Sequence, residues 1–223
     1  MNQEPQEGQE QEQEQSAVTL GGRLWVSERR LGRMAGVLRR RQPDLTVVIE
    51  NVHDPHNISA VLRSCDAVGV ETVHLVYTHE ERPQLSRISS ASALKWLKIV
   101  DHPDIAACYA ALRRQGCRIY ATHIGEASLD LYALDLARPS ALVFGNERRG
   151  VSDEALALAD AGVVIPMMGM VQSLNISVAC AVSLYEALRQ RRLAGAYAAP
   201  KLSQGEIDAR LTRWLEREGR ITP

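Results

Sequence analysis

The chain has 223 residues, of which 45% are hydrophobic and 24% charged, and its formal net charge at pH 7 is −1. This length is long for one domain and short for two, so we expect one compact domain with appendages. No apolar run approaches the roughly 20 residues of a membrane-spanning helix, and the N-terminus lacks the basic, apolar and small-residue progression of a signal peptide. We therefore expect a cytoplasmic protein with no membrane partner.

Residues 1–16 alternate glutamine and glutamate and contain almost no apolar side chains. Such a composition cannot bury enough surface to offset the entropy of ordering, so we expect a disordered tail. The tail holds five of the chain's 27 acidic residues and no basic residue. The other 22 acids face 26 basic residues, so the rest of the chain carries a net charge of +4.

Helix and strand patterns alternate along the rest of the chain. Residues 17–43 read as a basic extension with a helix over 27–41, which Pro43 ends. β-Branched and apolar runs predict strands over 45–50, 72–77, 99–100, 118–122, 140–144 and 162–165. Helical spacing predicts helices over 57–68, 103–115, a short segment capped by Ser152, 175–192 and 203–218. This alternation predicts an α/β domain over 44–194, with a parallel sheet flanked by helices, and a C-terminal helical extension over 195–223.

Several common nucleotide and hydrolase motifs are absent from the sequence. It has no G-x-G-x-x-G after a strand, no phosphate-binding G-x-x-x-x-G-K-[ST] and no G-x-S-x-G elbow. In parallel sheets, ligands bind beyond the carboxyl ends of the strands. The loops that leave predicted strands at that end are 51–57, 122–126, 145–150 and 166–174.

The cysteines and histidines indicate neither disulfides nor metal. Cys65, Cys108, Cys117 and Cys180 form no C-x-x-C pair, and no histidine stands at zinc-finger spacing to them. We interpret them as buried reduced thiols. His53 and His56 flank Pro55 and are interpreted as turn or surface residues.

The first segment that could carry chemistry runs from Asn57 to Arg63. Asn57 stands where a helix N-cap is expected, which is a sufficient structural reason for it. Arg63 lies about 140° around the helix from the apolar residue Ile58, so a solvated arginine is an open alternative to a functional one.

Two further segments follow predicted strands. Residues 144–150 form a turn bounded by glycines, with Glu147 between them. Residues 165–177 combine a strand end, a Met/Gly loop and a helix capped by Asn175. The third segment contains no Lys or Arg, so a pocket there suits an adenine ring and a thioether better than a phosphate, although packing of the loop would also explain its methionines.

Together these segments resemble the SpoU family of RNA 2′-O-methyltransferases, in the knotted SPOUT class. N-x-x-x-x-x-R at 57–63, G-N-E-x-x-G at 145–150 and I-P-M…S-L-N-x-S at 165–177 match its three motifs in order, and the match extends over about 45–192. The stretch 39–70 is similar to the TrmH branch, which acts on guanosine 18 of transfer RNA.

The resemblance implies a deep trefoil knot in the C-terminal part of the sheet, a homodimer through helix 175–192, and S-adenosylmethionine as the cofactor. It implies that Arg63 is catalytic, that Asn57 orients it and that Glu147 shapes the site. The implied cofactor residues are Thr122, Gly145, Ile165, Met167, Leu174 and Asn175. No metal is implied, because the sulfonium methyl is already activated.

Arginines cluster near both ends of the predicted domain, which is compatible with solvated helix faces or with a polyanionic partner. With the family segment that ends at Lys95, the implied RNA-binding residues are Arg33, Arg39, Arg40, Arg41, Lys95, Arg189 and Arg192. Relatives often carry His where this chain has Leu94, which bears on the choice of nucleotide.

We therefore predict methyl transfer from S-adenosylmethionine to a ribose 2′-hydroxyl of tRNA, at guanosine 18 in the D-loop. Methylation of another tRNA position or of rRNA is an alternative, as is a non-catalytic RNA-binding knot protein. Whether Arg63 acts as a base or as an electrostatic stabiliser is open, because arginine stays protonated in proteins.

Overall fold

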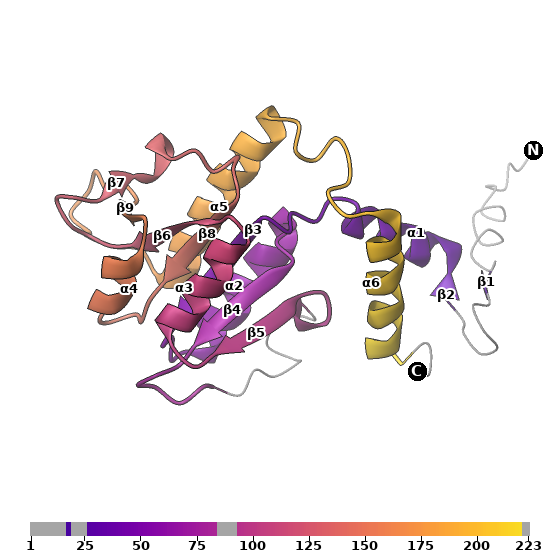
Figure 1. The fold of residues 1–223 in the computed structure, drawn as a ribbon, viewed down its shortest axis with the longest axis horizontal. Coiled ribbons are helices and arrows are strands. Elements are labelled where there is room, and N and C mark those ends of the chain that lie inside the picture. The colour runs from indigo at the N-terminus through magenta and orange to yellow at the C-terminus, as the bar shows by residue number, and fades with distance from the viewer. Residues whose placement is uncertain (1–16, 19–25, 84–92, 220–223) are drawn as a thin grey trace, which may run out of the picture. The chain divides into compact units, whose positions relative to one another are not determined.

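The computed structural model describes residues 17–18, 26–83 and 93–219 (Figure 1). The predicted tail 1–16 and residues 84–92 of the segment that ends at Lys95 lie outside these residues. The chain divides into two compact units. The larger comprises residues 40–201, and the smaller comprises 1–39 with 202–223.

The larger unit is built on a parallel sheet that has seven strands within the described residues. The strands are β3 (Leu45–Glu50), β4 (Thr72–Val76), β5 (Lys98–His102), β6 (Arg118–Thr122), β7 (Leu129–Asp130), β8 (Ser140–Phe144) and β9 (Ala161–Val164). Their spatial order is β5-β4-β3-β8-β6-β9-β7. The central strands β3 and β8 are buried along their whole length, which explains why their sequences are mostly apolar rather than alternating.

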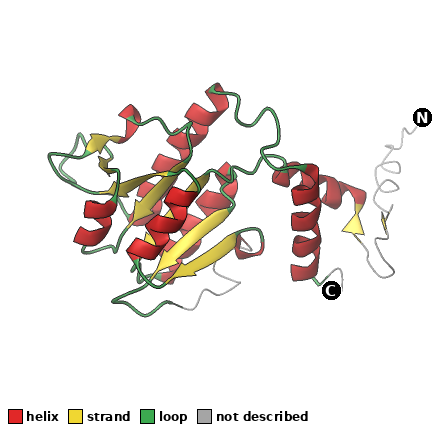
Figure 2. Cartoon of the chain, in the orientation of Figure 1, coloured by secondary structure: helices red, strands yellow, loops and turns green. Residues whose placement is uncertain are grey.

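Helices cover both faces of this sheet (Figure 2). The helices are α2 (Pro55–Val68), α3 (Ile105–Arg114), α4 (Asp153–Leu158) and α5 (Ile176–Leu193), with single 3₁₀ turns η1 (Ala93–Lys95) and η2 (Leu131–Ala133). Val47 and Ile49 belong to the core cluster that includes α2 and α5, whereas Val48 belongs to the cluster that includes α3 and α4. Successive strand residues thus face opposite helix layers. The predicted α/β sheet flanked by helices is confirmed.

The start of α2 differs from the sequence prediction. Its N-cap is Asp54, whose carboxylate accepts the backbone N–H of His56, and Pro55 is the first helical residue. Proline suits this position because its fixed φ is helical and its missing N–H would have no partner there. The prediction that Asn57 is the N-cap is therefore wrong, and its side chain needs another explanation.

The two terminal extensions contribute to the smaller unit. Its described elements are β1 (Ala17–Val18), β2 (Val26–Ser27), α1 (Glu28–Leu38) and α6 (Gln204–Arg217). Helix α1 packs against α6, and Arg30 forms an ion pair with Glu218. A capping box between Ser203 and Glu206 starts α6.

The arginine clusters separate into exposed and buried members. Arg33, Arg39, Arg40, Arg189 and Arg192 are exposed, and Lys95 is half-buried. Arg41 is completely buried and donates hydrogen bonds to the Val70 carbonyl and the Asp66 carboxylate. The prediction that Arg41 contacts RNA is therefore wrong. Its guanidinium is buried inside the fold and forms its hydrogen bonds there, as a buried cation must.

Arg191 is the second completely buried arginine. It lies near the end of α5 and donates to the carbonyls of Leu136 and Arg138 and to the Asp44 carboxylate, at 2.9, 2.8 and 2.7 Å. Lys201 donates to the other oxygen of Asp44 at 2.6 Å. This network ties the end of α5 to the start of β3.

The Asp44 carboxylate makes the stability of the fold depend on pH. Burial alone would raise its pKa, but hydrogen bonds from Lys201 and Arg191 outweigh burial and hold the pKa below the usual 3.8. The stabilisation is complete above the unfolded-state pKa and is lost as the pH falls through the lower folded-state pKa. We therefore expect Asp44→Asn to lower the urea unfolding midpoint at pH 7 and to have less effect near pH 3. A difference that is the same at every pH would contradict this assignment.

The four cysteines are all buried and form no disulfide, as predicted. None of the helices in the described part of the chain combines the length and the apolarity needed to cross a membrane.

Candidate active site

A cavity of about 580 Å³ opens beyond the carboxyl ends of β6, β8 and β9. This volume lies within the usual range for small-molecule and cofactor sites. Its lining comes from the segments 122–124, 144–150, 163–165 and 172–176, together with Met167 and Ala179. Parallel strands end at the same edge of the sheet, so segments far apart in sequence meet there.

The sequence-predicted cofactor residues all line this cavity: Thr122, Gly145, Ile165, Met167, Leu174 and Asn175. The Thr122 hydroxyl donates to the Val143 carbonyl at 3.0 Å, which fixes the end of β6 against β8. Arg148 and Arg149 also line the cavity, although the 165–177 segment itself supplies no cation.

The 145–150 loop is held in one tight conformation. A Cβ added to Gly145 would lie 2.1 Å from the carbonyl carbon and oxygen of Gly150, so there is no space for a side chain. Gly150 has φ +72°, a conformation that glycine adopts readily. Its N–H donates to the Asn146 carbonyl at 2.8 Å. The loop therefore presents backbone rather than side chain to the cavity at Gly145.

We expect Gly145→Ala to destabilise the protein by about 1–3 kcal/mol, the usual cost of overpacking. It should also weaken cofactor binding at least about tenfold, because 1.4 kcal/mol of distortion at a binding surface already corresponds to that factor. Calorimetric titration with S-adenosylmethionine measures the loss. Gly169→Ala is the matched control, since a Cβ there meets no atom within 4 Å. Equal affinity in the two variants would show that the close approach at Gly145 is unimportant.

Two asparagines that the sequence analysis did not select support this loop. The Asn146 side chain accepts from the Arg148 and Arg149 N–H groups and donates to the Asn51 carbonyl at 2.8 Å. Asn51 is buried with φ +51°, and its side-chain oxygen accepts the N–H of Thr78 at 2.9 Å. Asparagine tolerates this left-handed conformation better than most residues. The feature of the sequence that could have identified Asn51 is its position directly after the buried strand β3.

The three sequence motifs meet in one hydrogen-bonded chain. The Asn57 amide nitrogen donates to Glu147 at 2.9 Å, and the Asn175 amide nitrogen donates to the Asn57 oxygen at 3.1 Å. The Asn175 oxygen in turn accepts from the Ser177 N–H and so caps α5. The Asn57 side chain therefore links the glycine-bounded loop to the start of α5.

Glu147 is held as an anion in this arrangement. Burial alone would raise its pKa, but hydrogen bonds from Asn57 and from the backbone N–H groups of His53 and Asp54 outweigh burial and lower it. Those N–H groups lie in the turn at the start of α2, where the helix dipole also favours negative charge. The carboxylate is thus fixed at the rim of the cavity.

Arg63 is exposed on α2, does not line the cavity, and has no hydrogen-bond or ion-pair partner among the described residues. It follows Asn57 by six positions, which places the two about 120° apart around the helix axis. Within the described part of the chain no hydrogen bond joins Asn57 to Arg63. The structure therefore gives Asn57 different partners from the one that the sequence analysis assigned to it, and leaves Arg63 available to a ligand.

This chain belongs to the SpoU rRNA Methylase family, whose family model matches residues 44–185. It is 49% identical over 191 residues to a tRNA (guanosine(18)-2'-O)-methyltransferase of Thermus thermophilus, covering 86% of this chain and 98% of that one. The family membership predicted from the three motifs is confirmed.

Solved structures agree with this assignment. The A. aeolicus TrmH/SpoU tRNA modifying enzyme matches with a TM-score of 0.81 and 39% identity, over 87% of this chain and 98% of that one. The SpoU methyltransferase AviRb from Streptomyces viridochromogenes, in complex with AdoMet, matches with a TM-score of 0.60 and 31% identity, over 70% and 63% of the two chains.

Proposed function

We propose that this protein transfers a methyl group from S-adenosylmethionine to the ribose 2′-hydroxyl of guanosine 18 in tRNA. The observation that carries the proposal is the cavity at the strand ends, lined by every cofactor residue that the motifs predict. The Thermus relative, similar over nearly its whole length, is a tRNA (guanosine(18)-2'-O)-methyltransferase, and this similarity supports the choice of nucleotide.

The residues of the cavity fit S-adenosylmethionine. The close approach at Gly145 leaves a backbone surface against which a flat ring can lie, and Ile165, Met167 and Leu174 offer apolar contacts. When bound, the cofactor supplies a methyl group on a positively charged sulfur, which needs no further activation. The protein must therefore align the ribose oxygen with that methyl and assist the loss of the hydroxyl proton.

We assign Arg63 to stabilisation of charge at the ribose. Its guanidinium remains protonated and can donate to the developing alkoxide or to a neighbouring phosphate. Glu147 and Asn175, connected through Asn57, hold the rim of the cavity in position. No metal ion has a role in this scheme.

We also propose a homodimer and a deep trefoil knot, on the basis of family resemblance. Exposed apolar side chains on α5 support the dimer: Val178, Tyr185 and Leu193 are 46%, 54% and 78% exposed. The long helix would bury this surface against a second copy. Size-exclusion chromatography with light scattering tests the oligomeric state.

The proposed RNA-binding residues of the larger unit are Arg40, Lys95, Arg189 and Arg192. The smaller unit separately contributes Arg33 and Arg39. Contacts to the phosphate backbone suit a folded tRNA, because shape and charge dominate recognition of structured RNA. We also propose that the protein is cytoplasmic, because its proposed substrate is tRNA.

The test is methylation of purified tRNA with labelled S-adenosylmethionine, followed by mapping of the modified ribose. The matched control is the same tRNA with 2′-deoxyguanosine at position 18, which keeps the base and removes only the acceptor hydroxyl. We expect label on the first tRNA and none on the second. Label on both would indicate another position. Saturable cofactor binding without transfer to tRNA or rRNA would indicate a binding protein.

A further inference from the structure

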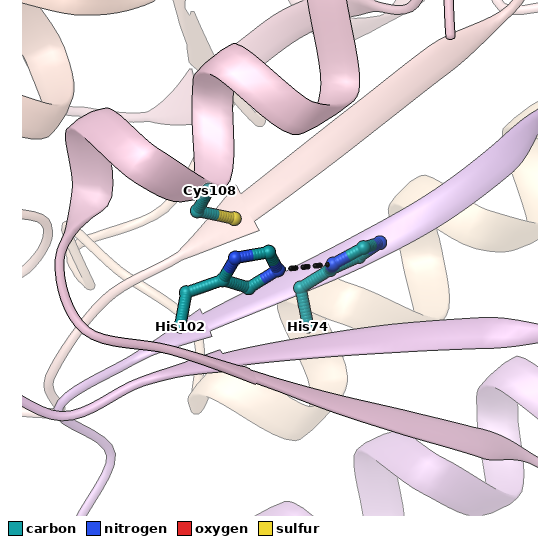
Figure 3. A group of neighbouring side chains, drawn as sticks. All are labelled: His74, His102 and Cys108. Atoms are coloured by element: carbon teal, nitrogen blue, oxygen red, sulfur yellow. Dashed lines mark hydrogen bonds between the residues drawn. The ribbon is translucent and has the colours of Figure 1, made fainter. Parts of the chain in front are cut away.

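Two histidines and a cysteine meet on the face of the sheet that α3 covers (Figure 3). His74 lies on β4, His102 ends β5, and Cys108 projects from α3. The Nδ1 atom of His74 lies 2.8 Å from Nε2 of His102, and the rings stack with centroids 5.0 Å apart. One side-chain atom from each of the three residues lies within 4.8 Å of the others.

These donors form a recognised metal-binding set. Two imidazole nitrogens and a thiolate suit zinc and similar borderline or soft ions, whereas carboxylates and carbonyls suit magnesium or calcium. Bond lengths of about 2.0–2.3 Å to zinc place tetrahedral ligand atoms about 3.3–3.7 Å apart. Metal binding would therefore open the hydrogen bond that now holds the two histidine nitrogens 2.8 Å apart, while the sulfur already lies within 4.8 Å of both.

The surroundings leave one side of the cluster open. His74 and Cys108 are buried, at 3% and 0% exposed, while His102 is only half-buried. A fourth ligand such as water can therefore approach beside His102. The carboxylates of Asp101 and Asp104 lie near His102 and add negative potential on that side of the cluster. The Lys98 ammonium adds positive potential near His74.

The cluster lies apart from the candidate active site. Strands β4 and β5 are at one edge of the sheet, whereas the cavity lies beyond β6, β8 and β9. None of the three residues lines that cavity. Their chemistry is therefore not used by the proposed methyl transfer.

We propose that His74, His102 and Cys108 bind one zinc-class ion, which fastens α3 to the edge of the sheet. The inference is independent of the proposed function. Binding converts the buried thiol to a metal-bound thiolate and releases its proton to solvent. Bonds that connect α3 with β4 and with the edge strand β5 would stabilise this edge of the sheet.

Cobalt titration tests the site directly. The full-length, tag-free protein is stripped with a chelator and titrated with Co²⁺, and zinc affinity is then measured by competition with a chromophoric chelator. We expect one ion per chain, a thiolate-to-cobalt charge-transfer band, and loss of that band in Cys108→Ser. His102→Gln should weaken zinc binding at least about tenfold, since changes in the outer shell of a metal site alone cost 10–100-fold.

Matched controls separate this site from general binding. Cys117→Ser removes another buried cysteine of the same apolar cluster, and His79→Gln removes an exposed histidine. Both should bind like the wild type. Because His102 is half-buried, its glutamine variant should keep the fold, which circular dichroism checks. Absence of stoichiometric binding, a cobalt spectrum without the thiolate band, or equal binding by His102→Gln would each overturn the proposal, the last by indicating an adventitious ion only.

Discussion

Arg63→Ala is expected to reduce methyl transfer on the order of 10²-fold or more while leaving S-adenosylmethionine binding unchanged. The size of the effect is that of removing one preorganised donor from a developing oxyanion. Cofactor affinity should be retained because Arg63 does not line the cavity. Single-turnover methylation of tRNA and calorimetric titration of the cofactor measure the two quantities separately.

A second substitution distinguishes the loss of this guanidinium from the loss of any positive charge. Arg114 is likewise exposed, lies at the end of α3 and is absent from the cavity lining. Arg114→Ala removes one charge of the same kind and should methylate at nearly the wild-type rate. If Arg63→Ala also turned over near-normally with its cofactor affinity intact, Arg63 would have no catalytic role.

Arg191→Met is expected to lower the free energy of unfolding by about 3 kcal/mol or more, the range found when one partner of a buried ion pair is removed. The substitution keeps an unbranched side chain but leaves the carbonyls of Leu136 and Arg138 without this donor. Lys201 still contacts Asp44, so the carboxylate keeps one cation. Urea unfolding should show a lower midpoint with an unchanged slope.

The neighbouring arginine is the matched control for this experiment. Arg192 is exposed, so Arg192→Ala should leave the urea midpoint nearly unchanged. As part of the proposed RNA surface, it should instead weaken tRNA binding and reduce the salt dependence of that binding. Protein concentration must be equal in all unfolding experiments, since a dimer's stability depends on it. Equal destabilisation by both variants would refute the distinction between them.

Local sequence patterns were sufficient for the six longer strands of the sheet and for the position of the cavity. The predicted bounds of β3, β6 and β8 agree with the structure, because β-branched runs between turn residues specify extended backbone locally. The residues predicted to bind the cofactor converge on one cavity because parallel strands end at one edge of the sheet. Strand β7 was missed, since two residues carry too little pattern to identify a strand.

Only the tertiary structure could assign partners to the polar side chains. Arg40 and Arg41 are adjacent and identical in type, as are Arg191 and Arg192, yet one of each pair is buried. Asn57 looked like a helix cap, but it connects Glu147 with Asn175.

The same limit applies to the candidate metal site. His74, His102 and Cys108 have no metal-binding spacing in sequence, and they meet because two strands and a helix pack together. Backbone preference and apolar periodicity are local properties, so the order of elements, the motifs and the edge where they meet could be predicted before the chain is folded. The partner of a buried charge or donor is supplied by a segment that can be more than a hundred residues away, as Asp44 is from Arg191. Such partners are decided only when the chain has packed.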